Sequence, residues 1–193
     1  MLKEKLIKEF GEERLHLQFS AIQDEQDMRE ALAYLISLYP ANVKKVAIET
    51  GTFHGVSTAL LAEYFDEVHT FDICKEGGGY YKDENIKFEI WDFMKVSDKI
   101  TFHMIKNDKE KEEIIKKIPY NFAFIDGQHK GGVDKDFVLL SRCGKVLFHD
   151  YCPEKCTPAR TGMYDYVVEF IDTLAENIVY KKPPFVVWVK NNN

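Results

Sequence analysis

The sequence contains no apolar run close to the roughly 18–20 consecutive residues that a membrane-spanning helix needs, so we expect no membrane partner. Its N-terminal residues alternate charged and apolar side chains and lack the apolar core of a secretory signal. The four cysteines are too few and too scattered for a disulfide framework. These absences predict a cytoplasmic protein with reduced thiols.

A large excess of one charge is also missing. Lys and Arg together number 26, and Asp and Glu number 32, which gives a formal net charge of −6. This mild acidity argues against a protein that binds phosphate backbones in general. We therefore expect no nucleic-acid partner.

Length and composition suit one ordinary α/β domain. The chain has 193 residues, of which 45% are apolar, and this is enough to build a buried core. No internal repeat and no linker divides it. We predict a single domain over residues 1–193, with an N-terminal helical cap over 1–42 and a Rossmann-like core over 43–190.

From Val43 onward, short β-rich runs alternate with segments of helical periodicity. This alternation predicts a doubly wound, mostly parallel sheet of seven strands with helices on both faces. The last two strands lie on either side of Pro183-Pro184, a tight connection, so the last strand should be antiparallel. Residues 86–98 fit a strand or a helix, and we favour a helix. The expected strands include residues 46–48, 68–71, 100–105, 122–125, 146–148, 178–180 and 185–189.

Polar or glycine-rich residues follow four of the expected strands. Ligands of parallel α/β sheets bind at the carboxyl ends of the strands, so these residues form one candidate site. They are Glu49 to Gly55, Asp72, Asp126 to His129, and His149 with Asp150.

The segment after the first strand reads Glu49-Thr50-Gly51-Thr52-Phe53-His54-Gly55-Val56-Ser57. Its glycines fit a tight turn or a close approach of a ligand to the backbone, and both interpretations stay open. No Gly-Lys-Ser/Thr follows, and the third glycine of the dinucleotide fingerprint is missing. The acid Glu49 suits a cationic ligand such as an ammonium group, and would repel a pyrophosphate.

Asp72 follows the second strand, 21 residues after Gly51. An acid at this place commonly accepts hydrogen bonds from a ribose diol. The alternative is a solvated strand end. Together with the glycine segment, Asp72 predicts a site for a nucleoside that carries a cationic amino-acid tail.

Four segments together resemble the motifs of class I S-adenosylmethionine-dependent methyltransferases, most closely the small-molecule O-methyltransferases of macrocin and catechol type. They are Ile48 to Thr58, His69 to Ile73, Phe124 to His129, and Val146 to Tyr151. The resemblance implies methyl transfer from S-adenosylmethionine to a small-molecule acceptor, at a hydroxyl. The Asn/Asp-Pro-Pro-Tyr motif of base-modifying methyltransferases is missing.

The resemblance also implies a set of cofactor-binding residues. The glycine segment would lie under the methionine part, Ser57 would bind its carboxylate, Asp72 would hold the ribose, and Ile73 would pack on the adenine. The implied set is Glu49, Gly51, Thr52, Phe53, Gly55, Ser57, Asp72, Ile73 and Asp126.

The metal-dependent members of the group place an acid after strand four and a pair of ligands after strand five. The matching residues are Asp126, His149 and Asp150. A histidine departs from the oxygen ligands that Mg²⁺ prefers, so the site takes Mg²⁺, a softer ion such as Mn²⁺, or no metal. His129 stands where catechol-type enzymes carry their general base, and we predict that His129 and Asp126 are catalytic.

Three other functions stay open. One is a metal-dependent, hydroxylase-like relative of the same fold that transfers no methyl group. Another is a non-catalytic ligand-binding protein, and a third, an NAD-type oxidoreductase, is disfavoured by the missing glycine. Apolar stripes on the N-terminal helices would support a homodimer.

Overall fold

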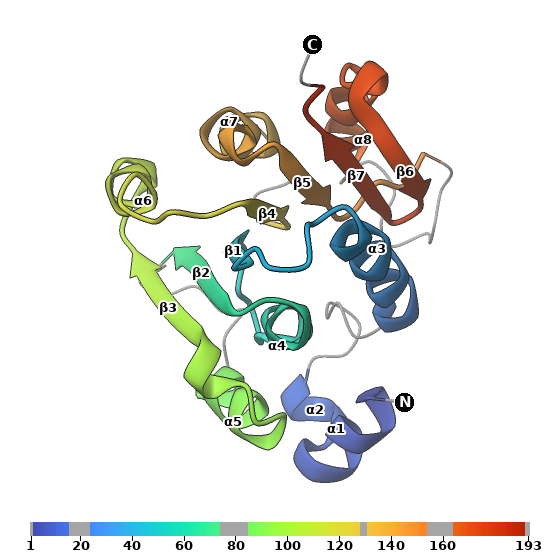
Figure 1. The fold of residues 1–193 in the computed structure, drawn as a ribbon. Coiled ribbons are helices and arrows are strands. Elements are labelled where there is room, and N and C mark those ends of the chain that lie inside the picture. Colours follow the sequence, from blue (N-terminus) through green and yellow to red (C-terminus); the bar gives the residue numbers. More distant parts are fainter. Residues whose placement is uncertain (1, 16–23, 74–84, 128–130, 154–163, 192–193) are drawn as a thin grey trace.

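A computed structural model describes residues 2–15, 24–73, 85–127, 131–153 and 164–191. Its centre is a seven-stranded sheet in the order β3-β2-β1-β4-β5-β7-β6 (Figure 1). The first five strands are parallel, and β7 runs antiparallel to both of its neighbours. The strands are β1 (Val46–Thr50), β2 (Glu67–Ile73), β3 (Ile100–Ile105), β4 (Phe122–Ile125), β5 (Lys145–Phe148), β6 (Ile178–Lys182) and β7 (Phe185–Val189).

Helices cover both faces of the sheet (Figure 1). One face carries α3 (Glu25–Ser37), α4 (Val56–Tyr64) and α5 (Ile86–Phe93), with α1 (Leu2–Phe10) and α2 (Glu12–Leu15) packed beyond them. The other face carries α6 (Asp108–Ile115), α7 (Val133–Leu140) and α8 (Asp165–Asp172). The observed order of strands and helices confirms the predicted doubly wound, Rossmann-like architecture.

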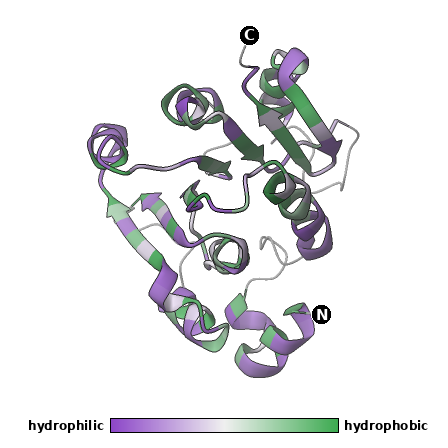
Figure 2. Ribbon diagram, in the orientation of Figure 1, coloured by the Kyte–Doolittle hydropathy of each residue, from purple (hydrophilic) through white to green (hydrophobic). Residues whose placement is uncertain are grey.

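The core lies in two layers because successive strand residues point to opposite faces. In β1, Ala47 packs into the layer that contains α3, α4 and α5, and Ile48 packs into the layer under α6, α7 and α8. All five residues of β1 are buried, as expected for a central parallel strand. Figure 2 shows apolar residues on the central strands and hydrophilic residues on the outer sides of the helices.

The ambiguous segment after residue 85 is helical. α5 buries Ile86, Ile90 and Trp91 on one side, which is the spacing of a helix and not of a strand. Strand β3 follows at Ile100, so the preference for a helix before a third strand is confirmed. Asn107 caps α6, since its side chain accepts a hydrogen bond from the Glu110 backbone N–H at 3.0 Å.

The N-terminal helices reach the last strands of the sheet. α3 packs on β7 and β6, and Lys182 of β6 forms ion pairs with Asp27 and Glu30 of α3. Among the helices of the described residues, none combines the length and the apolar composition that a bilayer crossing requires.

Candidate active site

The turn between β1 and α4 is held close to the end of β4. Gly51 has a φ of +93°, and a Cβ atom placed on it would lie 2.2 Å from the backbone oxygen of Asp126. Gly55 has a φ of +72°, and its Cβ would lie 2.5 Å from Nε1 of Trp91, which donates a hydrogen bond to the Gly55 carbonyl at 2.8 Å. Backbone geometry therefore requires glycine at both positions before any ligand is considered.

Asp72 joins the ends of β1 and β2. Its Oδ2 accepts a hydrogen bond from the Phe53 backbone N–H at 2.9 Å, and its Oδ1 accepts one from Ile73 at 2.8 Å. Phe53 has a φ of +45°, which is uncommon for a residue with a side chain. The carboxylate thus orders the glycine turn beside it. Asp72 lies within β2, one residue before its end, and not after the strand as expected, because β2 extends to Ile73. Its side chain is partly exposed, and its contact with a ribose stays a prediction.

Glu49 is fully buried and points toward α4. Its carboxylate accepts hydrogen bonds from Ser57 at 2.6 Å and from Thr70 at 2.6 Å, and a further one from Thr58. Thr70 also contacts Thr52 through their hydroxyl oxygens, 2.6 Å apart. The structure thus pairs Glu49 with Ser57 beneath the turn, where the sequence interpretation had each of them contact the cofactor directly. Those two cofactor contacts stay predictions.

The surroundings of Glu49 change its acidity. Burial raises its pKa from an ordinary value of 4.5 to about 7, although the three hydroxyl hydrogen bonds act in the opposite direction, and the Asp126 charge raises it further. The folded protein therefore binds this proton more tightly than the unfolded chain does. By linkage, Glu49 lowers stability progressively as the pH rises from about 4.5 to about 7.

Replacement of Glu49 by glutamine should remove this pH dependence. Relative to the wild type, the free energy of unfolding of the Glu49→Gln variant should rise by about 3 kcal/mol between pH 5 and pH 8. Urea unfolding at several pH values measures the difference. Glu112→Gln, on the exposed side of α6, is the control and should follow the wild-type curve. Parallel curves for wild type and Glu49→Gln would contradict the assignment.

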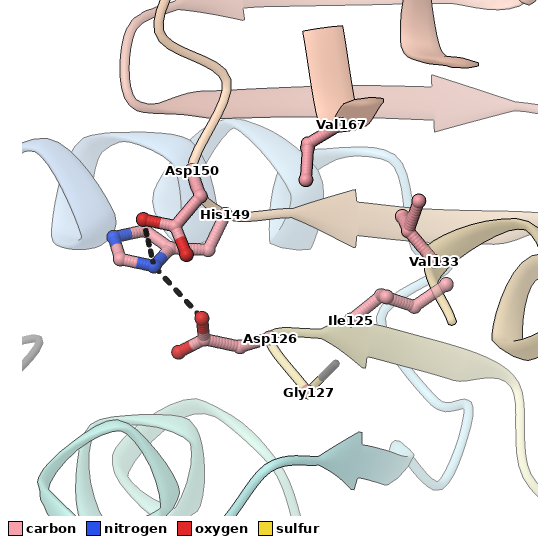
Figure 3. A pocket seen from close by; sticks show the side chains of 7 residues that line it. All are labelled: Ile125, Asp126, Gly127, Val133, His149, Asp150 and Val167. Atoms are coloured by element: carbon pink, nitrogen blue, oxygen red, sulfur yellow. Dashed lines mark hydrogen bonds and ion pairs between the residues drawn. The ribbon is translucent and has the colours of Figure 1, made fainter. Parts of the chain in front are cut away.

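The second part of the site lies after β4 and β5. Nδ1 of His149 lies 2.9 Å from Oδ1 of Asp126 and 3.4 Å from Oδ1 of Asp150. These residues line one side of a small cavity, and Ile125, Val133 and Val167 line the other (Figure 3). The cavity therefore has a polar wall and an apolar wall at the carboxyl edge of the sheet.

The turn that carries His149 and Asp150 is anchored on both sides. The His149 backbone N–H donates to Ile125 at 3.2 Å, and Asp150 has a φ of +61°. Tyr151, which is next in the chain, donates its hydroxyl to Asp172 at 2.8 Å and its backbone N–H to Pro184 at 3.0 Å. These anchors hold the two side chains toward Asp126.

The neighbours of His149 strongly shift the pKa of its imidazole. Burial lowers its pKa, but the charges and hydrogen bonds of Asp126 and Asp150 outweigh burial, so that the pKa lies well above the ordinary value of 6.5. The carboxylates favour a positive charge at this position, and either a proton on the imidazole or a bound metal ion can supply it.

The residues present fit a divalent metal ion. One ligand atom from each of Asp126, His149 and Asp150 can be chosen so that all lie within 4.8 Å of one another. Carboxylate oxygens with one imidazole nitrogen suit Mn²⁺, Fe²⁺ or Zn²⁺ better than Mg²⁺. The structure thus brings the predicted metal ligands together.

One residue of this cluster was missed by sequence reasoning. Asp24, just before α3, places Oδ2 3.3 Å from Nε2 of His149. No local pattern marks Asp24, because the contact joins positions 125 residues apart. His129, the predicted base, lies outside the described residues.

Comparisons with known proteins show the fold. No protein-family model matches the chain, and no curated protein matches it in sequence. A protein from Klebsiella pneumoniae assigned as an O-methyltransferase has a TM-score of 0.61 at 16% identity, over 98% of this chain and 96% of that chain. TomG is an O-methyltransferase of tomaymycin synthesis from Streptomyces achromogenes, solved in complex with SAM. Its TM-score is 0.59 at 15% identity, over 89% of this chain and 81% of that chain.

A third solved structure is an O-methyltransferase from Bacillus cereus in complex with SAH. Its TM-score is 0.56 at 14% identity, over 85% of this chain and 91% of that chain. The chain therefore has the fold of class I S-adenosylmethionine-dependent O-methyltransferases, which the four sequence segments predicted. A shared fold does not fix the acceptor.

Proposed function

We propose that this protein transfers a methyl group from S-adenosylmethionine to a hydroxyl of a small molecule. The observation that carries the proposal is the bond between Asp72 and the glycine turn at the carboxyl ends of β1 and β2. In a doubly wound sheet this is the place of the nucleoside site, with the acid on the ribose. Solved proteins of the same fold contain SAM or SAH.

The roles of the other residues follow from their places. Gly51 and Phe53 would lie along the methionine part of the donor, and Ile73 would contact the adenine. Glu49 and Ser57 would support this surface from below, since their side chains bond to each other at 2.6 Å.

The reaction is an in-line displacement. The acceptor oxygen attacks the methyl carbon, the carbon–sulfur bond breaks, and the hydroxyl proton passes to a base, for which His129 is our candidate. Asp126, His149 and Asp150 would hold a divalent ion, which when bound lowers the pKa of a coordinated hydroxyl. Because the sulfonium is already a strong electrophile, the protein contributes mainly alignment and proton removal.

Alanine at Asp72 should weaken binding of S-adenosylmethionine about 10- to 100-fold, because hydrogen bonds from the ribose to a charged acceptor are lost. Isothermal titration with S-adenosylmethionine and with S-adenosylhomocysteine measures the affinity. Asp98→Ala, an exposed acid before β3, is the matched control and should bind as the wild type does. Unchanged affinity in Asp72→Ala removes the ribose assignment, and no binding by the wild type at hundreds of micromolar overturns the proposal.

The second candidate function is hydroxylase-like, metal-dependent oxidation on the same fold. The observation that favours it is the imidazole of His149 beside two carboxylates, a donor set that suits redox-active ions. The mass of the product decides between the candidates. Methyl transfer adds one CH₂ to the acceptor and needs S-adenosylmethionine. Hydroxylation adds one oxygen atom from O₂, needs a two-electron reductant for the second oxygen atom, and uses no S-adenosylmethionine.

A further inference from the structure

Asp24 is a helix N-cap residue whose side chain does not cap its helix. Asp at this position usually accepts a hydrogen bond from a backbone N–H of the first turn. In α3 the Asp24 side chain makes no such cap bond, and its Oδ2 lies instead 3.3 Å from Nε2 of His149. The carboxylate is about four-fifths buried, with 19% of its side chain exposed.

The two nitrogens of His149 thus face different partners. Nδ1 faces Asp126 and Asp150, and Nε2 faces Asp24. Without an ion, a proton on Nδ1 is donated to Asp126. When Nε2 alone carries a proton and donates it to Asp24, the lone pair of Nδ1 can bind an ion that the two carboxylates also bind. Histidines that bind metals commonly donate their second N–H to a carboxylate in this way, which fixes the tautomer and the ring orientation.

We propose that Asp24 is a positioning residue that orients His149 for a divalent ion shared with Asp126 and Asp150. This inference rests on the metal-assisted form of the proposed function. It makes the N-terminal helical segment a part of the site, because α3 packs on β7 and β6, and β7 pairs with β5, the strand that leads to His149.

The test measures Mn²⁺ binding to the full chain without S-adenosylmethionine, with free Mn²⁺ followed by electron paramagnetic resonance. Asp24→Ser retains a good N-cap residue but is too short to reach the imidazole. Its Mn²⁺ affinity should fall about 10- to 100-fold. Asp24→Asn retains an oxygen acceptor for the Nε2 proton and should restore the affinity to within a few-fold of the wild type.

Asp27→Ala is the matched control, since it loses an ion pair of the same helix without touching His149. It should bind Mn²⁺ as the wild type does, and thermal unfolding should show that Asp24→Ser is no less stable than this control. Equal affinity of wild type and Asp24→Ser overturns the proposal, as does a wild type that binds no Mn²⁺. Binding of S-adenosylmethionine is measured in a separate titration. Failure of the proposed function can therefore be distinguished from failure of the role proposed for Asp24.

Discussion

Alanine at Gly51 should lower the free energy of unfolding by about 4 kcal/mol or more and abolish binding of S-adenosylmethionine. A residue with a side chain at positive φ costs about 1–2 kcal/mol, and the new Cβ would lie 2.2 Å from the Asp126 oxygen and 2.9 Å from Cα of Gly127. Both neighbours are backbone atoms, so neither can rotate away. Thermal unfolding should show a loss of roughly 10 °C or more.

Gly131 provides the control for the conformational part of this effect. It has a φ of +65°, but nothing lies within 4 Å of the Cβ that alanine would add. Gly131→Ala should therefore cost only the strain of about 1–2 kcal/mol. Equal losses at the two positions would show that the close approach of the β1 turn to β4 contributes nothing.

Methionine at Lys111 should lower the free energy of unfolding by about 3–5 kcal/mol. Lys111 of α6 and Asp136 of α7 form an ion pair in which both side chains are at least 90% buried. Removal of the cation leaves the Asp136 carboxylate in the interior without its main countercharge. A Cβ on Gly127 would lie 3.5 Å from Asp136 Oδ2, so the pair lies beside the segment that carries Asp126.

The double variant Lys111→Met, Asp136→Leu separates charge from packing. It should recover most of the lost stability, because two apolar side chains replace a buried ion pair at little cost. Lys116→Met, which breaks an exposed ion pair with Glu112 on the same helix, should change stability by less than about 1 kcal/mol. Urea unfolding compares all three. A double variant as unstable as Lys111→Met would contradict the burial argument.

The positions of the strands along the chain could be predicted because the β-rich runs are short, apolar and separated by turn residues. Residues 86–93 were ambiguous because Ile86, Phe88 and Ile90 alternate as in a strand. The structure resolves this through packing: Ile90 and Trp91 are buried together, while Phe88 is 44% exposed. The alternating apolar residues therefore did not form a strand, because a helix packs on this face of the sheet.

The site was predicted in part. Asp126, His149 and Asp150 could be placed together since the carboxyl ends of neighbouring parallel strands share one edge. The hydrogen bonds of Glu49 could not be predicted. They depend on which face of the sheet the side chain points to and on which helix packs there, and tertiary structure determines both. Asp24 was missed for the same reason, because no pattern in its local sequence indicates a contact with the distant His149.

The N-terminal helices find their partners late in the chain. Lys182 reaches Glu30 across 152 positions, and Asp24 reaches His149 across 125. A ribosome releases α3 long before the strands on which it docks, since domains form as their segments emerge. A nascent chain that has already formed the glycine turn still lacks β5, and His149 can contact Asp24, Asp126 and Asp150 only after β5 has emerged. The ion pairs of α3 with Lys182 form only after β6 has emerged. The cluster of Asp24, Asp126, His149 and Asp150 can therefore assemble only after β5 has emerged.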